Sequence, residues 1–84
     1  MNSKHRKTLD AMQAVPVNGA IAWARIEALF VTLGCRVIEG PGAAVTFEHQ
    51  GHKVNFQRPH PGKEALRYRV LAALEFLQKL GVTT

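Results

Sequence analysis

The stretch AVTFEHQGHKVNFQ, from Ala44 to Gln57, constrains the fold more than any other part of the chain. Apolar and polar residues alternate in both of its halves, which is the pattern of β-strands with one buried face. The pair Gln50-Gly51 separates the halves, and a two-residue loop with glycine in its second position is a strong hairpin signal. The sequence therefore predicts an antiparallel hairpin.

A two-residue loop also fixes the register of the hairpin, because one strand can then pair with the other in only one way. The pairs predicted for the apolar face are His49–His52, Phe47–Val54 and Val45–Phe56. The pairs predicted for the opposite face are Glu48–Lys53, Thr46–Asn55 and Ala44–Gln57. We expect the apolar face to pack on the core, and the polar face to be wet or covered by a partner.

Helical periodicity predicts helices before and after the sheet. The expected order is an N-terminal helix (1–15), a connector (16–22), a helix (23–34), a three-stranded sheet (35–58) and a C-terminal helix (63–81). In the last helix an apolar stripe is expected to face the core: Leu66, Val70, Ala73, Leu77 and Leu80. The sequence therefore predicts one α+β domain, with helices packed on one face of a three-stranded antiparallel sheet.

Length and composition limit the classes of protein to consider. With 84 residues, 46% of them hydrophobic, the chain can form one domain with a core. No apolar run is long enough to span a bilayer or to act as a signal peptide, so we expect a cytoplasmic protein with no membrane partner. The single cysteine, Cys35, excludes an intrachain disulfide and a cysteine-based zinc site, and is expected to be buried.

The junction between the hairpin and the last helix, NFQRPHPGKEALRYR, concentrates positive charge in a chain of formal net charge +5. Such a balance favours phosphate-bearing partners, and glycine and a helix start allow an anion close to the backbone. Five cations, opposed locally by Glu64 alone, are predicted to hold nucleic-acid phosphates: Lys53, Arg58, Lys63, Arg67 and Arg69. The alternative is a solvated surface that keeps the protein soluble.

Two groups of histidines could carry chemistry. His60 lies among the junction cations, and a histidine with a pKa of about 6.5 can act as general base or acid in RNA cleavage without a metal. The alternative is a turn histidine that hydrogen-bonds backbone or phosphate. His49 and His52 are close enough across the hairpin to share a metal, but zinc needs a further ligand and Glu48 points to the other face. No metal and no cofactor is expected.

Three stretches, the opening KHRKTLDAM, the segment W.RIEAL and the junction F.RPHPGKE, resemble the HicA toxins of bacterial HicA–HicB toxin–antitoxin modules. The likeness is to the longer subgroup with an extra N-terminal helix. It implies a double-stranded-RNA-binding-domain-like fold, α-β-β-β-α, and a toxin of a type II system that acts as an mRNA interferase, a metal-independent endoribonuclease. The implied partners are mRNA and a HicB-like antitoxin, and the assemblies considered are a homodimer or a heterotetramer with the antitoxin.

The chain departs from the family at its catalytic position. In the family a histidine follows a Gly-Ser pair at the start of the second strand, whereas here Ala44 follows Gly42-Ala43. The longer relatives are expected to carry a second histidine where Gln57 stands, and the predicted register places Gln57 opposite Ala44.

Three explanations remain open. Cleavage could depend on His60, with Arg58 and Lys63 stabilising charge; the chain could be an inactivated variant; or it could bind RNA without cutting it. A rival interpretation from another class is a protein-interaction module, whose polar sheet face docks HicB or a second copy.

Overall fold

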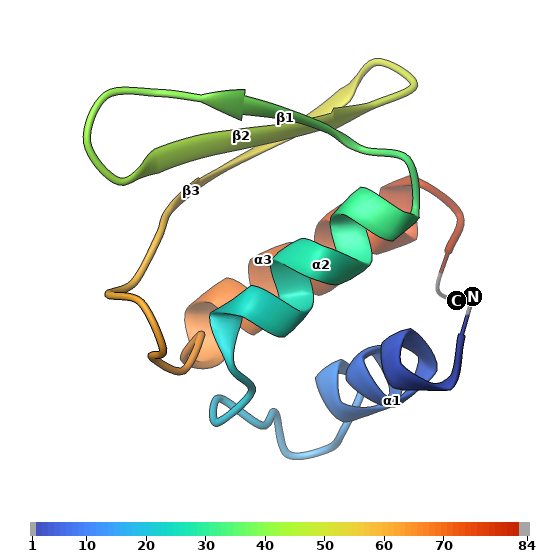
Figure 1. The fold of residues 1–84 in the computed structure, drawn as a ribbon. Helices are drawn as coiled ribbons and strands as arrows, with labels where there is room; N and C mark the ends of the chain where they lie inside the picture. Colours follow the sequence, from blue (N-terminus) through green and yellow to red (C-terminus); the bar gives the residue numbers. More distant parts are fainter. Residues whose placement is uncertain (1, 83–84) are drawn as a thin grey trace.

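Residues 2–82, described by a computed structural model, form three helices and one antiparallel sheet (Figure 1). The elements are α1 (Ser3–Met12), α2 (Trp23–Thr32), β1 (Arg36–Glu39), β2 (Ala44–His49), β3 (His52–Gln57) and α3 (Arg67–Lys79). The strands lie in the order β1-β2-β3. Helices α2 and α3 lie against one face of the sheet, and α1 lies beyond them (Figure 1). The predicted α+β class, with three helices and a three-stranded antiparallel sheet, is confirmed.

The hairpin has the register that its alternation predicts. His49 lies opposite His52 next to the loop, and Ala44 lies opposite Gln57 at the far end. The loop residues Gln50 and Gly51 both have positive φ, 52° and 85°. Such a loop matches the twist of the flanking strands, which is why glycine is favoured in it.

The core lies between the apolar face of the hairpin and α2. Phe47 is fully buried there, and its ring centroid is 4.8 Å from that of Phe30. The rings of Trp23 and Phe56 are 4.9 Å apart, within the range of favourable aromatic pairs. Cys35 is buried as predicted, and burial raises the pKa of its thiol.

The C-terminal helix begins at Arg67, so the predicted start at residue 63 was wrong. The preceding segment instead bonds to the connector before α2: the Lys63 carbonyl accepts from the Trp23 amide at 3.1 Å, and the Ala65 amide donates to the Ile21 carbonyl at 2.7 Å. Backbone groups need partners wherever they are buried. Here the partners are distant in sequence, and no local signal reveals them.

Leu66 does not belong to the core stripe of α3, which is a second correction. Its side chain is 48% exposed, whereas Val70, Ala73 and Leu77 are fully buried. Its backbone has φ 73° and ψ 157°, a combination that residues other than glycine rarely adopt. The Leu66 amide donates to the Gly19 carbonyl at 3.0 Å, and this bond holds the residue in that conformation. The stripe therefore starts at Val70.

Candidate nucleic-acid interface

A hollow of about 500 Å³ lies where the chain leaves β3 and passes the loop between β1 and β2. The Arg58 amide donates to the Ala43 carbonyl at 2.9 Å and joins the two sides. The lining residues are Gly42, Ala43, Arg58, Pro59, His60, Pro61 and Arg69. The hollow therefore brings together the loop before Ala44 and part of the junction that the sequence singled out.

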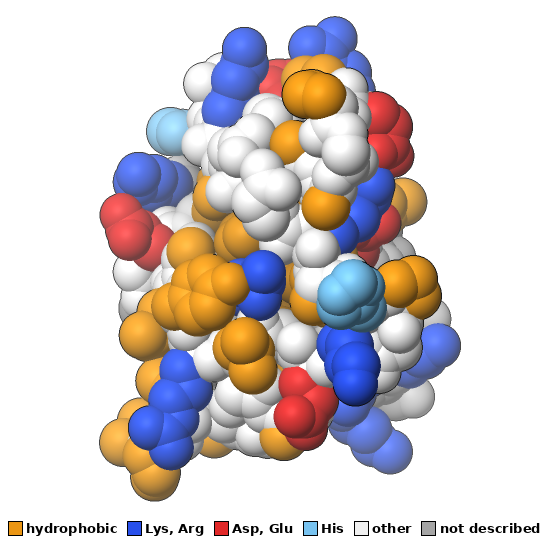
Figure 2. Space-filling view, turned by 90° about the vertical axis from the view of Figure 1, so that its left-hand side faces the viewer, with side chains coloured by type: hydrophobic (Ala, Val, Ile, Leu, Met, Phe, Trp, Pro, Cys, Tyr) orange, Lys and Arg blue, Asp and Glu red, His pale blue; other side chains and the backbone are white. Residues whose placement is uncertain are grey.

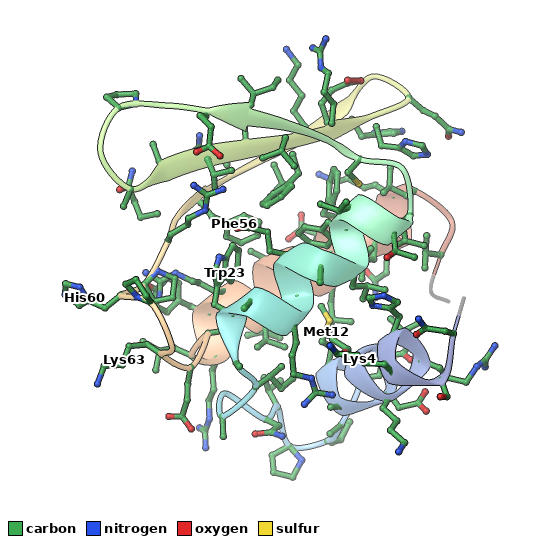
Figure 3. All side chains as sticks on the ribbon, viewed as in Figure 1. Lys4, Met12, Trp23, Phe56, His60 and Lys63 are labelled. Atoms are coloured by element: carbon green, nitrogen blue, oxygen red, sulfur yellow. The ribbon has the colours of Figure 1, made fainter. Side chains whose placement is uncertain are left out.

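His60 stands on the rim of this hollow. Its side chain is exposed and points away from the body of the protein (Figure 3). Its carbonyl accepts from the Lys63 amide at 3.0 Å, which closes the turn that holds both residues. An exposed imidazole on the rim is accessible to a ligand that approaches the hollow from solvent.

Ala44 and Gln57 face each other at the end of the sheet that adjoins the hollow. They are the two positions at which the resemblance leads us to expect histidines. An alanine methyl group cannot transfer a proton, and a carboxamide does not titrate. The paired positions therefore place no titrating side chain at this end of the sheet.

Arg58 is held by two carboxylates. Its Nε donates to Glu27 Oε1 at 2.9 Å and its Nη1 to Glu39 Oε1 at 2.6 Å, while its Nη2 reaches a second oxygen of each acid, at 3.2 and 3.0 Å. These hydrogen bonds lower the pKa of Glu39 and raise the pKa of Arg58 further above its ordinary value. Glu27 Oε1 also accepts from the Trp23 indole at 3.0 Å. Arg58 thus ties the end of β3 to α2 and β1.

The sequence did not indicate that Glu27 and Glu39 bind Arg58, since the acid that stands within the junction is Glu64. Glu27 and Glu39 lie 31 and 19 residues from Arg58, so no local pattern connects them. Because both acids already occupy its guanidinium, Arg58 is less available to a phosphate than the sequence suggested.

Arg69 is also engaged within the molecule. Its Nε donates to the Gln57 carbonyl at 2.9 Å, its Nη1 donates to the Ala65 carbonyl at 3.2 Å, and its guanidinium lies 4.6 Å from the centre of the Tyr68 ring. These contacts fix the start of α3 against the end of β3. Arg69 therefore borders the hollow mainly as a structural clamp.

The other three cations lie apart from one another. Lys63 is exposed in the junction loop (Figure 3), and Arg67 borders a different hollow beside the connector before α2. Lys53 lies next to Lys79 near the end of α3, four residues along β3 from Gln57 and so about 13 Å away. The sequence grouped Lys53 with the junction cations, and the structure separates it from them.

Figure 2 shows the distribution of charge on the side of the molecule that carries the junction. Lys and Arg side chains are spread over this face, and hydrophobic, acidic and uncharged groups separate them. The charge on this face is therefore divided among several places and not gathered into one basic surface.

The described residues contain neither a metal-binding cluster nor a helix suited to cross a membrane. No three His, Cys, Asp or Glu side chains within residues 2–82 lie close enough to share a metal ion. Over the same residues, no helix has the length and apolar character needed to cross a bilayer.

Comparison with known proteins assigns no family to the chain. A scan against protein-family models finds no match, and searches of curated proteins and of solved structures find no significant similarity. What can be inferred about function therefore comes from the residues and their geometry.

Proposed function

We propose that this protein is a HicA-like toxin, an RNA-binding domain with a double-stranded-RNA-binding-domain-like fold that cleaves mRNA in the cytoplasm and is neutralised by a HicB-like antitoxin. The observation that carries the proposal is the site at the end of the sheet. Exposed His60 stands there beside the Ala44–Gln57 pair, at a hollow open to solvent. The element order α2-β1-β2-β3-α3 agrees with the fold that the resemblance implies.

RNA cleavage of this kind needs groups that move protons and a charge that stabilises the pentavalent phosphorus. A base removes the proton of the 2′-hydroxyl, the 2′-oxygen attacks phosphorus, and the bond to the 5′-oxygen breaks as that oxygen receives a proton. At the hollow, His60 is the side chain suited to proton transfer at neutral pH. Lys63, held in the same turn, supplies a positive charge to the phosphate.

The second candidate function is RNA binding without cleavage. It is favoured by the register, which places Ala44 and Gln57 where the family's histidines are expected and leaves His60 without a second histidine at the hollow. On this alternative the cations still bind phosphates, and binding weakens as salt rises because phosphate contacts release counterions.

Cleavage of RNA by the wild-type protein separates the two candidate functions, and His60→Ala tests whether His60 carries the cleavage. If the protein is a toxin, its induction in bacteria arrests growth, the purified protein cleaves RNA, and the variant lowers cleavage by about 10²–10⁴-fold, the usual contribution of general acid–base catalysis. His52→Ala, exposed at the opposite end of the hairpin, is the matched control and should retain activity. Arrest that is unchanged in His60→Ala excludes His60 as the catalytic group.

The absence of cleavage by the wild-type protein, together with salt-sensitive RNA binding, supports the non-catalytic function. Absence of both activities contradicts the two candidates together.

The proposed antitoxin gives an independent test. A HicB-like protein encoded beside this gene should form a stable complex with the chain and suppress growth arrest when the two are produced together. Size-exclusion chromatography with light scattering distinguishes a heterotetramer from a homodimer of the toxin alone. A complex that forms while RNA binding is undetectable at physiological salt would instead support a protein-interaction module.

A further inference from the structure

Half of the cations of residues 2–82 that form no ion pair lie on α1 and the start of α2; the others are Lys53, Lys63, Arg67 and Arg69. Of the cations in residues 2–82, four in this region form no ion pair: Lys4, Arg6, Lys7 and Arg25. The carboxylates that form ion pairs bind Arg36 on β1, Arg58 after β3 and Lys79 at the end of α3. Asp10, the acid of α1, is not among them. With four cations and one acid that form no ion pair, this helical region has an excess of positive charge.

Two of these cations border one hollow of the helical layer, and a third is a neighbour of one of them on α1. Lys4 and Arg25 border the same hollow between α1 and α2, whose other lining residues include the small side chains of Ala24 and Ala28. Lys7, three residues from Lys4, is its neighbour along α1 and is exposed, and Asp10 follows three residues later. We name Lys4, Lys7 and Arg25 the helical basic cluster.

A second, larger hollow continues along α2 from the same place. It has a volume of about 530 Å³ and is lined in part by Lys4, Ala24 and Ala28. The acid that borders it, Glu27, is already bound to Arg58 and to the Trp23 indole. The surface beside the helical basic cluster is therefore open and carries no unpaired acid from α2.

The junction is joined to the start of α2 through the backbone. The Trp23 amide donates to the Lys63 carbonyl at 3.1 Å, so Lys63 lies beside the first residue of α2, and Arg25 follows in the first turn of that helix. In Figure 3, Lys63 lies at the outer edge of the junction loop, and Lys4 lies on α1 beside the middle of α2. The junction backbone thus adjoins the first turn of α2, where Ala22 also pairs with Glu64, and Arg25 and Lys4 border a common hollow farther along.

We propose that Lys63 and the helical basic cluster form a track for the sugar–phosphate backbone of a single-stranded RNA whose scissile part lies at the junction hollow. The proposal rests on the proposed function and adds the path of the substrate. Long flexible cations beside an open groove are the usual means of following a nucleic-acid backbone without reading its sequence. A protein partner would be expected to bury a large aromatic or aliphatic anchor; this surface offers alanines and one exposed aliphatic side chain, Val31.

Binding of a fluorescently labelled single-stranded RNA, measured by anisotropy over a range of salt concentrations, tests the track. Each lost phosphate contact should lower the dependence of log K on log salt by about 0.7. Lys4→Gln/Lys7→Gln should therefore reduce the slope by about 1.4 and weaken binding by about tenfold at low salt. Arg25→Gln should act in the same direction by about half as much. Lys79→Gln/Arg36→Gln removes the same charge elsewhere and should leave the slope unchanged.

Failure of the track and failure of the proposed function give different results. If the wild-type protein shows no salt-dependent RNA binding, the proposed function fails and the track with it. If the wild type binds RNA and Lys63→Gln weakens binding, while the α1 and α2 variants match the control, the track alone is wrong. Variants that leave RNA binding intact but weaken the antitoxin complex would assign the cluster to a protein partner and overturn the proposal. Thermal melts matched to the wild type establish that each variant is folded.

Discussion

The β2–β3 hairpin and the junction that follows it are neighbours in sequence, but they are stabilised in different ways. In the hairpin, each strand residue pairs with one from the same short stretch, from His49–His52 at the loop to Ala44–Gln57 at the far end. In the junction, the backbone bonds to the connector before α2 and Arg58 bonds to Glu27 and Glu39. A pattern of local residues can therefore specify the hairpin, whereas the junction depends on segments that only folding brings near.

The same difference decides which cations are free. In the linear sequence, Arg58 and Arg69 look like members of a basic patch. In the folded chain each is bound to oxygen atoms of the protein, and the cations without ion pairs lie partly on another layer. Charge counted along a sequence thus overstates what a surface offers to a ligand.

The largest expected effect comes from the buried face of the hairpin. Phe47→Ala removes a fully buried ring between α2 and the sheet and should cost about 3–5 kcal/mol, which is most of the stability that a domain of this size has. Val37→Ala is the control, because Val37 lies directly opposite Phe47 but is 36% exposed. Urea denaturation followed by circular dichroism measures both. Equal losses of unfolding free energy in the two variants would show that the buried Phe47 ring contributes no more to stability than the partly exposed Val37 side chain.

The next effect tests whether Arg58 supports the junction. Arg58→Met leaves Glu27 and Glu39 without their shared cation and should cost about 2 kcal/mol, the range for hydrogen bonds to charged groups. Arg36→Met is the comparison, since Arg36 is exposed and lies 3.8 Å from Glu48, a pair worth less than about 1 kcal/mol. The same denaturation experiment applies. If Arg58→Met costs no more than Arg36→Met, Arg58 is free for a phosphate as the sequence suggested.

A smaller effect, of opposite sign, is expected at Leu66. Leu66→Gly should stabilise the protein by about 1 kcal/mol, because glycine adopts φ 73° without the strain that a Cβ introduces, and the leucine side chain is half exposed. Leu66→Ala keeps the strain and should not stabilise. The melting temperature distinguishes the two. A melting temperature for Leu66→Gly at or below that of Leu66→Ala would show that the junction is not strained there.

The smallest effect is a pH dependence. Hydrogen bonding to Arg58 lowers the pKa of Glu39 in the folded protein. The resulting stabilisation is complete above the ordinary pKa of a glutamate and is lost as pH falls through the lowered value. Urea midpoints between about pH 7 and pH 3 should therefore fall less steeply for Glu39→Gln than for the wild type. Glu75→Gln, which removes an acid paired only with exposed Lys79, should follow the wild-type curve. If the urea midpoint of Glu39→Gln falls with pH as steeply as that of the wild type, the Glu39–Arg58 bond does not stabilise the folded protein.

The sequence predicted much of the fold and less of the candidate site. The register, the buried aromatic residues and the ends of the strands follow from periodicity and from one glycine-containing loop. At the site, the predicted pairing of Ala44 with Gln57 agrees with the structure. The structure differs from the prediction at the start of α3, in the exposure of Leu66 and in the position of Lys53.

What the sequence determined by itself was the pattern of burial, because a side chain's face in a strand or helix depends on residues two to four positions away. What the tertiary structure decided was which charges remain available and where the last helix begins. Arg58 finds its carboxylates, and Lys63 and Ala65 their backbone partners, only when α2 and its connector come to lie beside the junction. Long-range hydrogen bonds have no period in the sequence, so they become visible only in the folded chain.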